Sequence, residues 1–108
     1  MRTYQLFKDG AGKFGFRLIA ADGKTVLTSS VYATKLDAQR GIDLVRIHGR
    51  FEANYERTKT GAAYSFALHT AATGMLGTGE PYNSAQERDD AIAKVKRDAP
   101  HAPVEDKT

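Results

Sequence analysis

The sequence predicts an α+β fold in which two tandem β-β-β-α(-β) repeats form one mostly antiparallel sheet with two helices packed on it. The first observation is an internal duplication at an offset of fifty residues, which pairs Phe16 with Phe66, Leu18 with Leu68, Tyr32 with Tyr82 and Ile42 with Ile92. A second is that each copy places alternating apolar segments before one segment of helical periodicity. A third is length, because 108 residues suit a single core and each half alone would be marginal. We therefore expect one pseudo-symmetric domain, with repeat one at 1–50 and repeat two at 51–108.

The first repeat begins with three expected strands, over 4–8, 14–20 and 25–31. Alternation places Phe14, Phe16 and Leu18 on the core face and Arg17 on the opposite face. Asp22-Gly23 predicts a tight hairpin turn between the second and third strands.

A helix is expected to follow the third strand. Thr34 and Asp37 form an approximate capping box, and Ala38, Gly41, Ile42 and Val45 make its buried stripe. Gly49 predicts a left-handed cap at its end.

The second repeat follows the same plan with different turns. A strand is expected over 51–57, a second strand carries Tyr64, Phe66 and Leu68 toward the core, and Thr73-Gly74 replaces Asp22-Gly23 as the hairpin turn. The glycine-rich segment 74–79 predicts a strand and a turn, because it lacks the spacing of a dinucleotide fingerprint. Ser84 and Glu87 cap the second helix, and Pro100 ends it. The tail from 101 to 108 is either disordered or a short edge strand around Val104.

Several of these segments resemble the YegP-like family of small bacterial proteins. The resemblance rests on FGFRL at 14–18, DG at 22–23, VLTS at 26–29, Tyr32 and GIDLV at 41–45, and on their counterparts YSFAL at 64–68, GT at 77–78, Tyr82 and IAKV at 92–95. It covers essentially the whole chain and implies tandem β3-α-β motifs, with the strand after each helix swapped onto the other repeat. Single-repeat relatives form this assembly as homodimers, so the resemblance implies a monomer here. The chain departs from the family at Ala91, where a helix glycine is expected, and at Thr73-Gly74. The family's function is uncharacterised, and it provides no catalytic motif to transfer.

Composition excludes several classes of function. The chain has no cysteine, which excludes disulfides and thiolate zinc sites. It shows neither a signal peptide nor an apolar run long enough to span a membrane, so a soluble, cytoplasmic protein without membrane association is expected. His48, His69 and His101 lack metal-ligand spacing, and no serine sits in a nucleophile elbow. We therefore expect no metal, cofactor or catalytic residue, and no enzyme activity.

Charge is unevenly distributed along the chain. The net charge is +3, with nine Lys/Arg and four Asp/Glu in the first half, against seven and nine in the second. One interpretation is ordinary surface charge. The other is a basic, open sheet face that binds single-stranded nucleic acid weakly. This speculative binding face would contain Arg17 and His69, bordered by Lys13, Lys24 and Arg57.

Two interpretations also remain for the duplicated tyrosines, Tyr32 and Tyr82, which precede the helix caps. They either line two symmetric pockets or staple each helix start to the sheet. The leading functional hypothesis is a small non-enzymatic binding or accessory module whose partner is an unknown protein or polyanion. Nucleic-acid binding through the basic sheet face is the alternative.

Overall fold

A computed structural model describes residues 2–108 and contains the expected elements in the expected order. They are β1 (Thr3–Lys8), β2 (Phe14–Ile19), β3 (Thr25–Ser29), α1 (Lys35–His48), the 3₁₀ helix η1 (Glu52–Asn54), β4 (Tyr55–Thr60), β5 (Ala63–Thr70), β6 (Gly74–Thr78), α2 (Ala85–Asp98) and β7 (Val104–Asp106).

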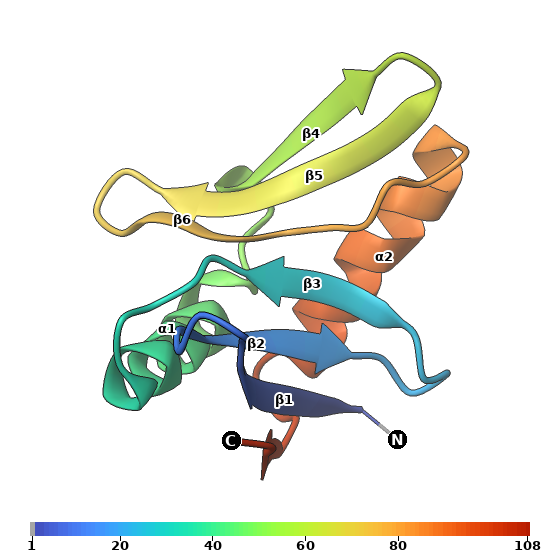
Figure 1. Ribbon diagram of the computed structural model, residues 1–108. Helices are drawn as coiled ribbons and strands as arrows, with labels where there is room; N and C mark the ends of the chain where they lie inside the picture. The colour runs from blue at the N-terminus through green and yellow to red at the C-terminus, as the bar shows by residue number, and fades with distance from the viewer. Residues whose placement is uncertain (1) are drawn as a thin grey trace.

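The seven strands form one bent sheet in the order β4-β5-β6-β3-β2-β1-β7. Each repeat contributes an antiparallel meander, and the two meanders meet at the β3–β6 junction. Only two residue pairs form this junction, Thr28 with Thr78 and Ser29 with Gly77. Figure 1 shows the resulting bend, with β4, β5 and β6 above and the remaining strands below. Because the two meanders are paired over such a short stretch, side chains of both repeats can face each other next to the junction.

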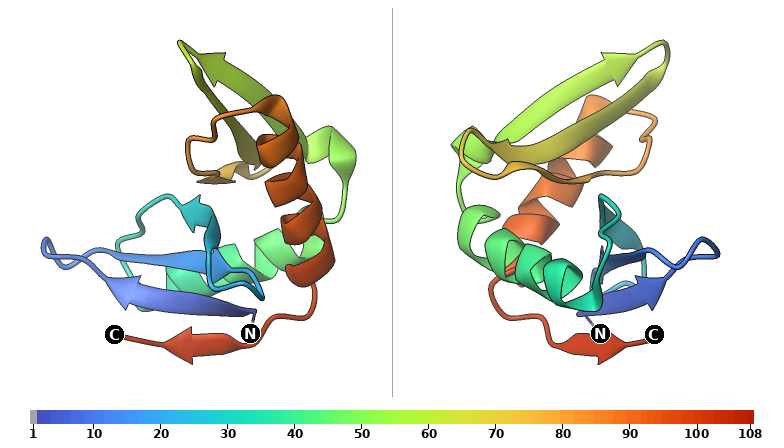
Figure 2. Two further views of the ribbon diagram at one scale, coloured as in Figure 1. Left: turned by 90° about the vertical axis from the view of Figure 1, so that its right-hand side faces the viewer. Right: turned by 60° about the vertical axis from the view of Figure 1, so that its left-hand side comes forward.

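The tail forms the exchanged strand that the resemblance implies. β7 follows α2 of repeat two but pairs in parallel with β1 of repeat one, matching Tyr4 with Val104 and Leu6 with Asp106. The Tyr4 amide donates to the Pro103 carbonyl at 2.8 Å, and the Lys107 amide donates to the Leu6 carbonyl at 2.8 Å. Figure 2 shows α2 running from the β4–β5 half toward β7 at the opposite end.

Both helices begin at the predicted caps. The Asp37 amide donates to the Thr34 hydroxyl at 3.1 Å, and the Glu87 amide donates to the Ser84 hydroxyl at 3.1 Å. These bonds satisfy amide groups that the first helical turn leaves without partners. One apolar stripe of each helix joins the aromatic and aliphatic strand residues in a single core, with Ala38, Ile42 and Val45 from α1 and Ala91, Ile92 and Val95 from α2.

The β2–β3 and β5–β6 hairpin turns are built on glycines with positive φ, 86° at Gly23 and 71° at Gly74. The left-handed backbone conformation is accessible to glycine without steric cost. The weaker Thr73-Gly74 signal therefore marks a turn of the same kind. At this turn the Thr73 amide donates to the Thr70 hydroxyl at 2.9 Å.

Two local predictions are wrong. The strand expected over 51–57 starts only at Tyr55, because residues 52–54 form η1. The Asn54 side-chain amide donates to the His48 carbonyl at 3.0 Å, which ties this turn to the end of α1, and Phe51 is 51% exposed. Gly49 has φ −68°, so the predicted left-handed cap is absent. Close packing explains the glycine instead, since an added Cβ would lie 2.7 Å from the Val45 carbonyl oxygen.

Candidate functional site

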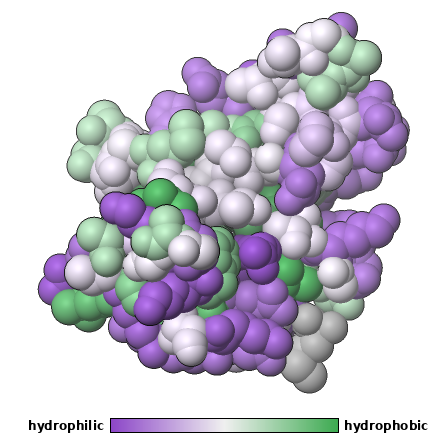
Figure 3. Space-filling model, in the orientation of Figure 1, coloured by the Kyte–Doolittle hydropathy of each residue, from purple (hydrophilic) through white to green (hydrophobic). Residues whose placement is uncertain are grey.

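The sheet face away from the helices carries one row of residues across all seven strands. In register order the row is Glu56, Ala67, Thr78, Thr28, Arg17, Gln5 and Glu105. It contains one basic and two acidic side chains. Figure 3, in the orientation of Figure 1, shows a surface on which hydrophilic residues alternate with pale and hydrophobic ones. The row therefore does not form a basic stripe.

Arg17 and His69 lie on this face, as expected, but each has a local partner. The Arg17 guanidinium lies 4.4 Å from the centre of the Phe7 ring, and its Nη1 donates to Gln5 Oε1 at 3.5 Å. His69 Nε2 lies 4.0 Å from Glu56 Oε1. Neighbouring side chains thus engage both of the groups that were expected to meet a polyanion.

The three residues expected to border the face occupy other places. Arg57 lies on the helix side of β4, opposite the core residue Phe66 in the register, and its Nε donates to Asp89 of α2 at 2.9 Å. Its predicted position at the open face is therefore wrong. Lys13 is an exposed residue of the β1–β2 turn, whereas Lys24 lines a pocket between the repeats.

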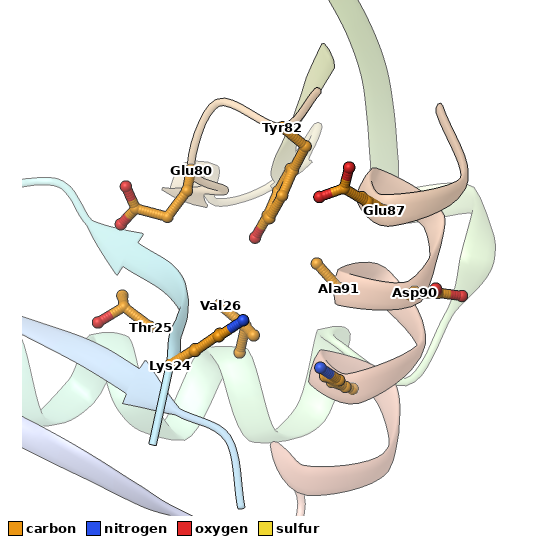
Figure 4. Close-up of a pocket in the computed structure, with 9 residues that line it drawn as sticks. Lys24, Thr25, Val26, Glu80, Tyr82, Glu87, Asp90 and Ala91 are labelled. Carbon is orange, nitrogen blue, oxygen red and sulfur yellow. The ribbon is translucent and has the colours of Figure 1, made fainter. Parts of the chain in front are cut away.

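This pocket has a volume of about 550 Å³, within the range of small-molecule sites. Its walls come from the β2–β3 hairpin of repeat one, and from the β6–α2 connection and α2 of repeat two (Figure 4). The lining residues are Lys24, Thr25, Val26, Glu80, Tyr82, Glu87, Asp90, Ala91 and Lys94. The site therefore exists only when both repeats are assembled.

Asp22 fixes the hairpin wall to the helix wall. Its Oδ1 accepts the Lys24 amide at 3.0 Å, and its Oδ2 accepts Lys94 Nζ at 3.0 Å. The Lys24 amide, and next the Lys94 ammonium, hold the pKa of Asp22 below its usual value. This exposed ion pair contributes little stability by itself, but it sets the position of Lys94 at the pocket.

Tyr82 lines the pocket from the β6–α2 connection. Two backbone hydrogen bonds with Tyr64, of 2.7 and 2.9 Å, hold it in place, and its hydroxyl points into the space between the walls (Figure 4). The hydroxyl oxygen is buried, and no protein group among residues 2–108 meets hydrogen-bond geometry with it. Burial raises the pKa of Tyr82. The backbone amide of Glu80 partly opposes this rise in pKa. The amide lies near the oxygen, but the pair does not meet the distance and angle requirements of a hydrogen bond.

The corresponding position in repeat one is closed. The Tyr32 ring stacks on Phe16, with centroids 6.4 Å apart and planes within 10°, and its hydroxyl lies over Gly41, where an added Cβ would be only 2.6 Å away. Ala91 replaces Gly41 in repeat two. The other lining residues change as well, since an offset of fifty places Gly74, Ser30, Arg40 and Leu44 where the pocket has Lys24, Glu80, Asp90 and Lys94. The two tyrosines therefore differ: Tyr82 lines a pocket, whereas Tyr32 packs against the sheet.

The lining combines charged, hydroxyl-bearing and apolar side chains. It contains no histidine or serine, and its only hydroxyl groups are those of Thr25 and Tyr82. Within residues 2–108 no group of three or more histidine or acidic side chains is placed to hold a metal ion. In the same part of the chain, no helix is long and apolar enough to cross a membrane.

Sequence reasoning identified Tyr82 as a possible pocket residue and assigned Lys24 to a different face. It missed the rest of the lining. The pocket could have been inferred from the positions at which one repeat has a charged residue and the other does not, such as Lys24 against Gly74 and Glu80 against Ser30.

Comparison with known proteins gives the family of the chain. The model of the family "Domain of unknown function (DUF1508)" matches residues 9–56 and again 61–106. The UPF0339 protein YegP of Escherichia coli K12 is 35% identical over 106 residues, covering 97% of this chain and 96% of the relative. A UPF0339 protein of Bordetella pertussis is 39% identical over 111 residues, covering 100% and 98%.

Solved structures agree with the sequence relatives. The solution NMR structure of E. coli yegP, titled a protein of unknown function, has a TM-score of 0.93 at 33% identity, covering 99% of this chain and 93% of that chain. A UPF0339 protein of Shewanella oneidensis gives 0.91 at 30% identity, covering 97% and 90%. With two DUF1508 matches, near full-length relatives and the same fold, this chain belongs to the UPF0339 family of YegP-like proteins.

Proposed function

We propose that the protein is a small, non-enzymatic binding module that takes a small ligand in the pocket between its repeats. The observation that carries this proposal is the buried Tyr82 hydroxyl, which has no hydrogen-bond partner among residues 2–108. Leaving a buried hydroxyl without a partner costs about 1–3 kcal/mol. A ligand that hydrogen-bonds this group recovers part of that free energy.

The lining supports the same proposal. Val26, Ala91 and the Tyr82 ring provide apolar contact, and charged side chains surround them. Apolar walls with a few polar groups are typical of ligand pockets. Because the hydroxyl oxygen is shielded, a ligand reaches it only after a lining side chain moves.

Pairing within the chain supports a monomeric module. β7 supplies the outer strand of the β3-β2-β1 half from the same chain, where a partner would otherwise be needed. One chain thereby contains both walls of the pocket.

The test is a fragment screen by two-dimensional NMR on ¹⁵N-labelled protein. We expect some fragments to shift the backbone resonances of Val26, Tyr82 and Ala91 in a saturable way. Tyr82→Phe should weaken those fragments that hydrogen-bond the hydroxyl about tenfold, or about 1.4 kcal/mol. Tyr32→Phe is the matched control, and we expect it to leave their affinity unchanged. A screen in which no fragment shifts these resonances would contradict the proposal.

A further inference from the structure

We propose that the ligand of this pocket is a short zwitterion, a molecule the size of a dipeptide with a free carboxylate and a free ammonium group. This inference rests on the proposed binding function and adds the charge of the ligand and its orientation. It is drawn from the placement of the charged lining residues around Tyr82.

The carboxylate end fits the side formed by Lys24, Lys94 and the Tyr82 hydroxyl. In Figure 4 the Lys24 ammonium and the Tyr82 hydroxyl point into the same space. Lys24 has no ion-pair partner within residues 2–108, whereas Lys94 is held by Asp22. A hydroxyl donor beside an uncompensated ammonium group is a suitable environment for a carboxylate.

The ammonium end fits the opposite side. Figure 4 shows the Glu80 and Glu87 carboxylates on either side of Tyr82, across the space from Lys24, while Asp90 points away. Neither glutamate forms an ion pair with a basic residue in the described part of the chain. Glu87 only accepts a 3.4 Å hydrogen bond from the Ser84 hydroxyl of its own helix cap.

Opposite charges on opposite sides of one pocket disfavour ligands that carry a single charge. An anion placed near Lys24 leaves the two glutamates uncompensated, and a cation placed near the glutamates leaves Lys24 uncompensated. A ligand with both groups satisfies both sides, and like-charge contacts reject the reversed orientation. The exposed charges are screened by solvent, so they determine selectivity more than affinity.

The apolar floor limits the body of the ligand. Val26 and Ala91 are almost fully buried, with 3% and 4% of their surface exposed; in Figure 4 Val26 lies beside the Lys24 side chain, and Ala91 faces the space from α2. Small aliphatic side chains match these contacts. L-Alanyl-L-alanine is therefore the probe of choice.

The experiment compares three peptides of nearly equal size by NMR titration of the ¹⁵N-labelled protein. L-Alanyl-L-alanine is expected to shift the resonances of Lys24, Val26, Tyr82 and Ala91. The N-acetylated peptide, without the ammonium group, and the C-terminal amide, without the carboxylate, are each expected to bind at least about tenfold more weakly.

Two variants connect each charge to its side of the pocket. Lys24→Met should remove the advantage of L-alanyl-L-alanine over its C-terminal amide, and Glu80→Gln with Glu87→Gln should remove its advantage over the N-acetylated peptide. Lys13→Met, an exposed lysine outside the pocket, is the control and should change neither ratio.

The outcomes separate this inference from the proposed function. Equal binding of the blocked peptides overturns the zwitterion while leaving the pocket intact. The same conclusion follows if the fragment screen finds pocket ligands but L-alanyl-L-alanine does not bind. If neither the fragments nor the peptide shift the pocket resonances, both proposals fail.

Discussion

The Tyr4 hydroxyl of the first strand donates a 2.8 Å hydrogen bond to the carbonyl oxygen of Ala99, at the end of the last helix. An equivalent bond joins the repeats with their roles exchanged: the Tyr55 hydroxyl of β4 donates to the Gly49 carbonyl, at the end of the first helix, at 2.6 Å. Helix C-termini leave carbonyl groups without intrahelical partners. Each helix of this protein thus has its final turn completed by a buried tyrosine from the other repeat, and burial raises the pKa of both phenols.

Removing either hydroxyl should therefore destabilise the whole fold. We expect Tyr4→Phe and Tyr55→Phe each to lower the free energy of unfolding by about 1–3 kcal/mol, because each leaves a buried carbonyl without its donor. Urea denaturation followed by circular dichroism measures the change. Tyr64→Phe is the control, since the Tyr64 ring is only partly buried between Lys59 and Arg88. Losses no larger than that of the control would show that these two bonds contribute little.

Truncation after Ala102 tests the exchanged strand. It removes the backbone hydrogen bonds of β7 to β1 and the Lys35–Asp106 ion pair, while Ala102 itself remains in the core. With each hydrogen bond contributing about 1 kcal/mol, we expect the melting temperature to fall by about 10 °C or more. Lys35→Met removes only the exposed ion pair and should have a much smaller effect. An unchanged melting temperature in the truncated chain would argue against a structural role for β7.

Acid sensitivity should depend on Glu52. Hydrogen bonds from Arg57, and next from Lys96, lower the pKa of this carboxyl group from 4.5 to about 2. A carboxyl whose pKa is lower in the folded state stabilises the fold above its unfolded pKa, and the effect is lost as pH falls through the folded value. The stability difference between the wild type and Glu52→Gln should therefore be constant near neutral pH and shrink between about pH 5 and pH 2.

Urea denaturation at several pH values measures this difference. Asp43→Asn, at an exposed position of α1 without an ion pair in the described residues, is the control. A wild-type advantage over Glu52→Gln that persisted at pH 2 would contradict the assignment.

The glycine of α1 should be intolerant of a methyl group. Gly41→Ala gains about 1 kcal/mol in helix propensity, but its Cβ would lie 2.9 Å from the buried Phe16 ring and 2.6 Å from the Tyr32 hydroxyl. Overpacking of this kind costs about 1–3 kcal/mol, so we expect a net loss of stability. The reverse change, Ala91→Gly, should also destabilise, through the loss of helix propensity. If Gly41→Ala stabilised the protein instead, the Tyr32 and Phe16 side chains would have to move aside to accommodate the methyl group.

The open sheet face should not bind nucleic acid. Arg17 is the only basic member of its seven-residue row, and it is engaged by Phe7 and Gln5. We expect no binding of a fluorescent single-stranded oligonucleotide at about 50 mM salt, measured by anisotropy. Salt-sensitive binding that Arg17→Gln weakens would restore the nucleic-acid hypothesis.

Local patterns were sufficient to predict most of the fold. Strict alternation put Phe16, Leu18, Phe66 and Leu68 in the core, because a strand with one buried face repeats every two residues. The same alternation overextended the core at Phe14 and Tyr64, which are only half-buried where the strands begin. The strand expected over 51–57 begins late, because the Asn54 side chain bonds to the end of α1 and residues 52–54 form a 3₁₀ turn.

The pocket was beyond the reach of local pattern. Lys24 and Tyr82 lie in different repeats, and their proximity depends on how the two meanders meet at β3 and β6. Arg57 was misplaced for a similar reason, since its partners Glu52 and Asp89 come from η1 and from α2. Periodicity assigns a residue to a sheet face, but it does not determine which distant element covers that face.

The pairing of β7 with β1 also constrains the order of events during protein synthesis. Tyr4 and its partner Val104 are 100 positions apart in the chain, so a ribosome completes both β-meanders before the outer strand of the first is made. Until then the nascent first half exposes the unpaired edge of β1. Premature association of two nascent chains at that edge is the characteristic hazard of this topology. The outer strand of the first meander can therefore pair with β1 only after the end of the chain has emerged.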